Sequence, residues 1–487
     1  MFYKAVLRWQ TAHPSFNPAS YTDCHDMTAL TYAHDGFSGW IGVARRDITP
    51  PIGIYNRNWG AATGDVAVGI HRPLTLTALA LKRAADDAQP LVLISADLGW
   101  WRSREDEWEV RSAILGALGA DERCVLLHLT HTHAGPSICR EDADRPGGHL
   151  IEPYLDHVKR MSIAAAREAV QSAAPAVLEW AYGKCTLARN RDLPDPQASR
   201  IVCGFNPAQP ADDALLIGRA TAADGRVIAT LVNYAMHPVT LAWQNELISP
   251  DFAGGLRDVI EDNTGGAPCL FLQGASGELA PAEEYTGDPA IADKNGRALG
   301  FAALSTLAGM LPPGKRLRYV GVVESGAPLA TWASEDVVAS NRLTAGQLAI
   351  EIPLKASLPA LAEIEARLAT SKQTFMIERL RRQRQLRRAI GDGASAHMPF
   401  WVWRMGDALL VAHPNEAYSH LQIELRRRFP GRAIVVLNVT NGSYAYLPPR
   451  ATYELDQYQV WQTPFAAGCL EQTVEACARA ISEVMGH

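Results

Sequence analysis

The first informative stretch is Cys124-Val125-Leu126-Leu127-His128-Leu129-Thr130-His131-Thr132-His133-Ala134-Gly135-Pro136, in which an apolar run leads into two histidines and a Gly-Pro loop. A run of this length and composition is typical of a buried strand. In an extended chain successive side chains alternate between faces, so His131 and His133 share one face and His128 takes the other. Two imidazoles at a strand end suit a divalent-metal site. A pair of hydrogen-bonding loop histidines explains the same spacing, so the motif alone leaves both interpretations open.

Strand and helix signals alternate on both sides of this segment. The run Leu91-Val92-Leu93-Ile94-Ser95-Ala96 is a second buried strand, and an amphipathic helix is expected over Asp106–Leu118. This alternation predicts an α/β fold, with mixed α+β as the variant. Further strands are expected at Val227–Met236, Cys269–Gln273, Gln347–Leu354, Trp401–Val411 and Ala433–Val439, and helices at Tyr154–Ser172, Phe252–Asn263, Glu416–Phe429 and Glu471–Met485. Pro312–Ala339 is expected to be β-like or irregular, and Pro359–Ile390 to be a basic helical stretch broken near Ser371.

Composition excludes several classes of protein. The chain of 487 residues carries 46 Lys plus Arg and 52 Asp plus Glu, so its net charge is −6. This acidic balance disfavours a nucleic-acid partner. The basic run 379–388 is therefore expected to be a solvated helix face. No segment approaches the roughly 18 apolar residues of a membrane span. Eight scattered cysteines in a chain this long are not a disulfide scaffold.

The N-terminal residues 1–38 show neither a helical nor a strand period, and clear strand signals begin only at Gly39. We expect a poorly ordered arm over 1–38 and a single domain over 39–487, with a variable insertion at about 312–400. Because the arm lacks a continuous apolar core, we expect no signal peptide and a cytoplasmic location. A homo-oligomer is possible, and the sequence leaves the oligomeric state open.

Two further residues strengthen the metal interpretation. His237 follows an expected strand, and Glu416 stands where a strand is expected to pass into a helix. Zinc takes nitrogen and oxygen ligands, and open α/β sheets place their sites at strand ends. Sequence separation alone does not bring these side chains together in space.

A series of short motifs, taken in order, resembles the N-terminal catalytic domain of the neutral/alkaline ceramidases and their bacterial relatives. The resemblance covers most of the chain from Gly39 onward. Its motifs are Ile41–Pro50, Gly69–His71, Ser95–Gly99, Thr130–Pro136, Asn190–Arg191, Met236–Pro238, Leu247–Asp251, Gln273–Pro281, Pro414–Glu416, Asn441–Tyr446 and Gln457–Tyr458. The sequence ends soon after the last expected helix, so we expect no C-terminal immunoglobulin-like domain of the kind true ceramidases carry.

The resemblance implies a Zn²⁺ site and a polar shell around the scissile bond. Its zinc ligands fall on His131, His237, Glu416 and Tyr446, and its catalytic shell on His133, Arg191 and Tyr458. A bound Zn²⁺ lowers the pKa of a water to about 7, which supplies hydroxide at neutral pH. In the same region His71, Trp100 and Trp243 are candidates to line the substrate pocket.

One departure from the family bears on the mechanism. The loop Gln273-Gly274-Ala275-Ser276-Gly277-Glu278-Leu279-Ala280-Pro281 has Ala280 where ceramidases have a serine with assigned catalytic roles. Ser276 is displaced from that position and is interpreted as a turn residue. Attack by a metal-activated water is therefore favoured over a covalent acyl-serine route.

These observations predict a zinc-dependent hydrolase that cleaves a non-peptide amide, an N-acyl bond, in a small or amphiphilic substrate. An ester or lactone hydrolase would use the same site, because the same hydroxide and oxyanion donors serve any acyl transfer. A catalytically inactive binding relative is the alternative from another class, motivated by the missing serine.

Overall fold

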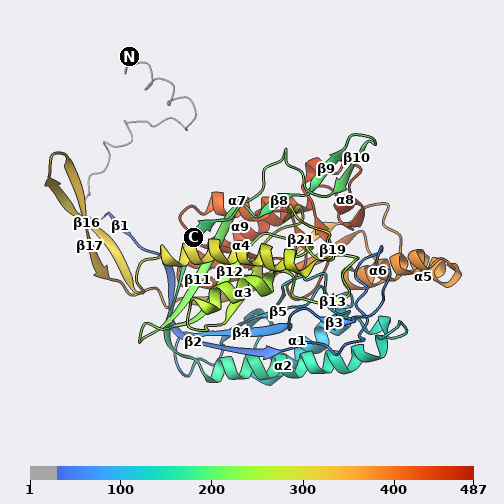
Figure 1. Cartoon of the computed structure of the whole chain (residues 1–487), viewed down its shortest axis with the longest axis horizontal. Coiled ribbons are helices and arrows are strands. Elements are labelled where there is room, and N and C mark those ends of the chain that lie inside the picture. Colours follow the sequence, from blue (N-terminus) through green and yellow to red (C-terminus); the bar gives the residue numbers. More distant parts are fainter. Residues whose placement is uncertain (1–29, 487) are drawn as a thin grey trace, which may run out of the picture. The chain divides into compact units, whose positions relative to one another are not determined.

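The computed structural model describes residues 30–486, which belong to two compact units. The larger unit runs from His34 to Pro313 and from Val338 onward; the smaller contains Gly314–Val337 and the described chain before His34. Figure 1 traces the elements of both. Within residues 30–486, no helix combines the length and the apolar character that a membrane span requires.

The centre of the larger unit is an eight-stranded sheet in the order β14-β12-β11-β7-β2-β4-β5-β6. Its strands are β2 (Asp35–Asp47), β4 (Thr75–Lys82), β5 (Leu91–Ala96), β6 (Val125–Leu129), β7 (Ala174–Lys184), β11 (Ala214–Ala222), β12 (Val227–Tyr234) and β14 (Cys269–Gln273). Two outer pairs, β5 with β6 and β12 with β14, are parallel, and the inner pairs are antiparallel. The expected α/β fold with mixed sheets is confirmed.

A second sheet packs against one face of the first. It has the order β18-β19-β20-β22, formed by β18 (Leu343–Pro353), β19 (Ser395–Met405), β20 (Ala408–Ala412) and β22 (Ile434–Leu437). Leu91 and Leu93 of β5 pack with Trp401 and Trp403 in the core between the sheets, whereas Val92 and Ile94 pack in the core under the helices. Because both faces of β5 are covered, its sequence is mostly apolar rather than alternating.

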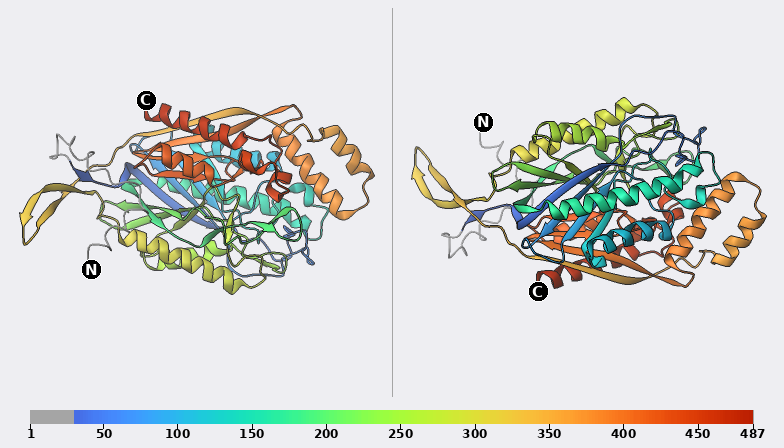
Figure 2. Two further views of the ribbon diagram at one scale, coloured as in Figure 1. Left: turned by 90° about the horizontal axis from the view of Figure 1, so that it is seen from above. Right: turned by 90° about the horizontal axis from the view of Figure 1, so that it is seen from below.

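Helices cover the two outer faces. On the first sheet lie α1 (Arg104–Leu118), α2 (Ile151–Gln171), α3 (Phe252–Asp262) and α4 (Pro289–Ala308); against the second pack α7 (His420–Arg428) and α9 (Cys469–Met485). In Figure 2 the red C-terminal helices and the yellow α4 lie on opposite sides of the strands. The larger unit is thus built in four layers, helix–sheet–sheet–helix.

Several elements differ from the sequence expectation. Strand β2 begins at Asp35 rather than Gly39, and Phe37 is fully buried. The single strand expected over Trp401–Val411 is the hairpin of β19 and β20, turned at Gly406 with φ 65°. The helix expected from Glu416 starts only at His420, because β21 (Glu416–Ala417) pairs with β23 (Tyr446–Leu447).

The region 312–400 contains strands and helices. In the smaller unit β16 (Lys315–Glu324) and β17 (Pro328–Asp336) form a hairpin, with β1 (Thr31–Tyr32) added to β16. The expected break near Ser371 separates α5 (Leu361–Thr370) from α6 (Thr374–Ile390). Residues 1–29 of the expected arm lie outside the described residues. The division of the chain into an arm, one domain and an insertion stays a prediction.

The basic helix α6 is only in part the solvated face that was expected. Arg381 pairs with Asp144 at 2.7 Å, and Arg384 pairs with Glu141 at 2.8 Å. Arg387 is buried and donates to backbone carbonyls, among them that of Pro359 at 2.9 Å. The arginines therefore attach the helix to the acidic loop at 141–144.

Candidate metal centre

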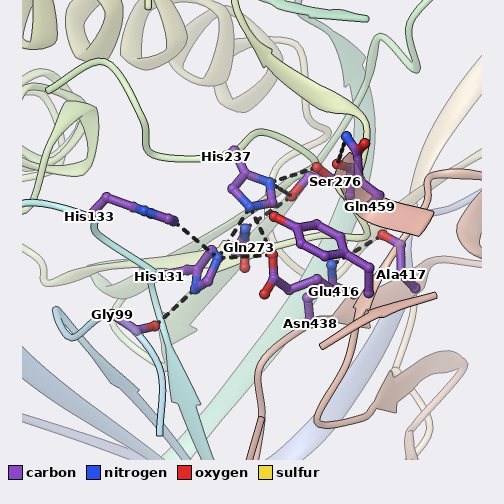
Figure 3. Close-up of polar contacts among 12 residues, drawn as sticks. Gly99, His131, His133, His237, Gln273, Ser276, Glu416, Ala417, Asn438 and Gln459 are labelled. Carbon is purple, nitrogen blue, oxygen red and sulfur yellow. Dashed lines mark hydrogen bonds and ion pairs between the residues drawn. The ribbon is translucent and has the colours of Figure 1, made fainter. Parts of the chain in front are cut away.

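The expected metal ligands meet where several strands end. His131 and His133 follow β6, His237 follows β12, and Glu416 lies in β21, directly opposite Tyr446 of β23. Figure 3 shows the three imidazoles turned toward one another with Glu416 beside them. The pairing of strands that are distant in the sequence thus brings these side chains together.

The convergence of His131 and His133 has a different origin from the one expected. Strand β6 ends at Leu129, so the chain is not extended through to His133. His131 instead has φ 69°, a left-handed conformation that costs a non-glycine residue about 1–3 kcal/mol. Its backbone N–H donates to Leu98 O at 2.9 Å, which holds the turn. The two histidines therefore meet through a strained loop and not through strand alternation.

The ring nitrogens lie close enough together to bind one shared cation. His131 Nε2 lies 3.2 Å from His237 Nε2 and 3.4 Å from His133 Nε2. Glu416 Oε2 is 3.1 Å from His237 Nε2 and 3.4 Å from His131 Nε2. The ligand atoms of the three histidines all lie within 4.8 Å of one another, which suits a metal ion.

Backbone carbonyls set the tautomers of two of these histidines. His131 Nδ1 donates to Gly99 O at 3.0 Å, and His237 Nδ1 donates to Ser276 O at 2.7 Å. With the proton on Nδ1, each Nε2 presents a lone pair to the cluster, as metal-binding histidines do. The donor set, neutral imidazole and carboxylate, fits a divalent cation such as Zn²⁺.

The pKa shifts favour the ligand forms of these groups. Burial lowers the pKa of His133 well below its usual value, and burial together with Arg191 lowers that of His237 to about 3. Burial alone would raise the pKa of Glu416, but His131 and His237 bring it well below its usual range. At neutral pH the site therefore holds uncharged His133 and His237 and an ionised Glu416.

Arg191 and two tyrosines line the other side of the cluster. Arg191 Nη2 donates to Gly277 O at 2.7 Å and to Tyr446 Oη at 3.3 Å, and it lies 3.4 Å from His237 Nε2. The Tyr446 ring stacks on His237 with centroids 6.2 Å apart, and the Tyr458 ring lies 5.8 Å from Tyr446. Burial raises the pKa of Tyr446 well above its usual value and that of Tyr458 to about 12, so both hydroxyls keep their protons at neutral pH.

Aromatic rings border the cluster on the His133 side. Trp100 lies 4.9 Å from His133, as its sequence position suggested. Trp59 lies 5.3 Å from His133 and was missed, as was Tyr285; Trp243 contacts these two rings at 6.0 and 6.1 Å. Both missed residues lie in loops without a helical or strand period, where single aromatic residues carry no local signal.

Two sequence candidates lie away from the Nε2 cluster. His71 Nδ1 is 3.0 Å from Ser249 Oγ and its Nε2 is 3.4 Å from Asp293, and none of these contacts reaches the other histidines. Ser276 Oγ accepts from Gln273 Nε2 at 3.0 Å and lies 3.5 Å from His237 Nδ1. The hydroxyl is thus on the Nδ1 side of the imidazole, opposite the cluster (Figure 3).

Fold and site define a four-layer α/β protein with a buried histidine–carboxylate cluster at strand ends. The fold is similar to that of the neutral ceramidase from Pseudomonas aeruginosa, with a TM-score of 0.65, 16% sequence identity, and coverage of 93% of this chain and 75% of that chain. A solved structure of a ceramidase complexed with C2 is similar as well, with a TM-score of 0.63, 17% identity, and coverage of 92% and 76%. The ceramidase-like fold expected from the motifs is confirmed. No protein-family model and no curated protein matches the sequence itself.

Proposed function

We propose that this protein is a zinc-dependent amidase that cleaves the N-acyl bond of a small or amphiphilic substrate. The observation that carries the proposal is the convergence of His131, His133, His237 and Glu416 at strand ends. His131 Nε2 lies 3.2–3.4 Å from a nitrogen or oxygen atom of each of the other three side chains, and Glu416 Oε2 lies 3.1 Å from His237 Nε2. The likeness of the fold to neutral ceramidases supports the amide as the bond that is cleaved.

His131, His237 and Glu416 would hold the Zn²⁺, with the Tyr446 hydroxyl as an unusual fourth ligand. When bound, Zn²⁺ supplies a Lewis acid for the carbonyl and lowers the pKa of a coordinated water to about 7. Glu416 is the negative ligand that offsets the charge of the ion, and the Nδ1 bonds to Gly99 and Ser276 keep the imidazoles aligned.

The remaining polar groups act on protons and on the developing charge. His133, which is uncharged at neutral pH, accepts the proton released by the attacking water and returns it to the leaving nitrogen. The Tyr458 hydroxyl donates to the oxyanion of the tetrahedral intermediate. Arg191, held on Gly277 O, adds a fixed positive charge beside the same oxygen.

The surroundings favour an apolar substrate. Trp100 and Trp59 flank His133 and offer an aromatic surface on which an acyl or alkyl chain can pack. Tyr458 is 37% exposed, so part of this residue is in contact with solvent. We expect a long chain to leave the site past Tyr458.

A substrate screen tests the proposal. The purified, zinc-loaded protein is assayed against N-acyl amines, N-acyl amino acids, esters and lactones, with zinc content measured in parallel. Faster turnover of amides supports the proposal, whereas turnover of esters or lactones alone would reassign the bond. A protein that binds zinc and hydrolyses none of these classes would instead be a binding relative.

A further inference from the structure

Glu284 is a buried carboxylate beside the candidate site that the proposed mechanism does not use. Both of its carboxylate oxygens are buried, and neither has a hydrogen-bond partner among residues 30–486. A buried polar group without a partner costs about 1–3 kcal/mol, and more when it is charged. Such a group in a native structure requires a reason.

The position of Glu284 places it at the Arg191 end of the site. Its Oε1 lies beside Gly204, within 3.9 Å of where a Cβ on that glycine would stand. The Gly204 N–H donates to Arg191 O at 2.7 Å. Arg191 in turn directs its side chain to Gly277 O, Tyr446 and His237, and makes no hydrogen bond to Glu284. Arg191 and Glu284 thus have opposite charges but no hydrogen bond to each other.

The next residue along the chain joins this loop to the aromatic surface. Tyr285 has φ 58°, a conformation that is uncommon outside glycine and that gathers at functional sites. Its ring lies 5.7 Å from Trp59, which contacts His133. In the proposed mechanism His133 delivers the proton to the leaving nitrogen, so the loop faces the amine side of the substrate.

We propose that Glu284 is a specificity-determining residue that accepts a hydrogen bond from a donor, a hydroxyl or an ammonium group, on the amine side of the scissile amide. This inference rests on the proposed amidase function. Because Arg191 already offsets the negative charge, the carboxylate needs no further counter-ion, which favours the neutral hydroxyl.

The ionisation of Glu284 is consistent with this role. Burial raises the pKa of its carboxyl to about 7, and Arg191, the nearby Tyr285 side chain and the Phe205 backbone oppose the rise. At pH 8 the group is therefore mostly an acceptor. A hydrogen bond to a charged acceptor contributes about 1.5–3 kcal/mol, or roughly tenfold to a hundredfold in selectivity.

Three amides of equal size separate the possible donors: N-octanoyl-2-aminoethanol, N-octanoyl-ethylenediamine and N-octanoyl-propylamine, which present a hydroxyl, an ammonium and a methyl group. The zinc-loaded protein is compared with Glu284→Gln at pH 8 through kcat/KM. If no amide is hydrolysed, which would count against the amidase function, the Kd of each amide is measured by calorimetry on the same protein. The two proposals can therefore fail separately.

The wild type is expected to prefer the hydroxyl or the ammonium amide over the methyl amide by about tenfold or more, and Glu284→Gln to reduce that preference to within about threefold. Glu283→Gln is the matched control, because Glu283 is exposed in the same loop and pairs with Lys294 at 2.6 Å. It should keep the preference. Should Glu284→Gln fail to fold, Glu284→Asp retracts the carboxylate by one methylene and should weaken the preference in the same direction.

The melting temperature gives a second readout. If the Glu284 carboxylate serves to bind a ligand, it is not needed for folding. The melting temperature of the Glu284→Gln variant should therefore equal or exceed that of the wild type. Equal treatment of the three amides by the wild type, or an unchanged preference in Glu284→Gln, would overturn the proposal. So would a failure of the hydroxyl and ammonium amides to bind.

Discussion

At the scale of single residues, the candidate centre depends on backbone carbonyls that orient its imidazoles. Ser276 illustrates this, because its carbonyl oxygen accepts from His237 Nδ1 at 2.7 Å while its hydroxyl is held by Gln273 at 3.0 Å. The backbone of Ser276 therefore orients a candidate ligand, and its side chain lies on the Nδ1 side of the imidazole, opposite the cluster.

We expect Ser276→Ala to lower kcat by no more than a fewfold, since at most one neutral hydrogen bond, of about 1 kcal/mol, is lost. Zinc content should be unchanged, because the carbonyl that orients His237 remains. Steady-state kinetics and elemental analysis check this. A loss of roughly a thousandfold with zinc still bound, on the scale of removing a nucleophilic serine, would establish a serine route instead.

Tyr458→Phe removes one hydroxyl donor and leaves the expected zinc ligands in place. If that hydroxyl acts only in the transition state, kcat should fall by about a hundredfold or more while zinc content stays constant. Tyr453→Phe is a matched control, because the Tyr453 hydroxyl donates to Phe465 O at 3.1 Å outside the site. An unchanged kcat in Tyr458→Phe would remove this tyrosine from the mechanism.

At the scale of secondary-structure elements, buried strands were predictable and their ends were not. The composition of Leu91–Ala96 and Cys124–Thr130 was sufficient to predict both strands, because strands covered on both faces are mostly apolar. The turn at His131 and the pairing of Glu416 with Tyr446 depend on contacts distant in sequence. Seven candidate site residues were named from family motifs, whereas Trp59 and Tyr285 had no motif and no period to identify them.

One element contact predicts a pH dependence of stability. Glu278 accepts from the backbone N–H of Ser419, the N-cap of α7, at 3.0 Å, and also from its hydroxyl. Burial raises the pKa of Glu278 from 4.5 to about 7, although Ser419 opposes the rise. The folded protein therefore binds a proton more tightly than the unfolded chain, and the contribution of this group to stability falls as pH rises from about 4.5 to 7.

Glu278→Gln should remove that contribution, because the glutamine keeps an acceptor oxygen and does not ionise. We expect the free energy of unfolding of this variant to fall less steeply than that of the wild type between pH 5 and 7. Urea unfolding at several pH values measures the slope. Parallel slopes for the two proteins would show that Glu278 ionises alike in the folded and unfolded states.

At the scale of the whole molecule, the smaller unit is expected to be dispensable for the metal site. Its hairpin leaves and rejoins the chain at Gly314 and Val337, whose backbones are joined by a hydrogen bond of 2.8 Å. A chain without residues 1–33, with Lys315–Asp336 replaced by two glycines, should therefore keep its zinc content and kcat. Loss of zinc, or a large fall in melting temperature, would show that the two units depend on each other.

In the larger unit, His131, His237 and Glu416 are expected to bind one zinc ion together. His131→Ala and His237→Ala each remove a neutral imidazole, and Glu416→Gln removes the charge that offsets Zn²⁺ while keeping the shape. His71→Ala is the matched control, because His71 contacts Ser249 and Asp293 instead of the cluster. Chelation should inactivate the wild type, and added zinc should restore it.

Zinc stoichiometry by elemental analysis, measured on these variants after dialysis against zinc-free buffer, tests this claim most directly. We expect about one zinc per chain in the wild type and in His71→Ala, and far less in His131→Ala, His237→Ala and Glu416→Gln. Full zinc retained by His131→Ala and His237→Ala, or a wild type that binds none, would contradict it.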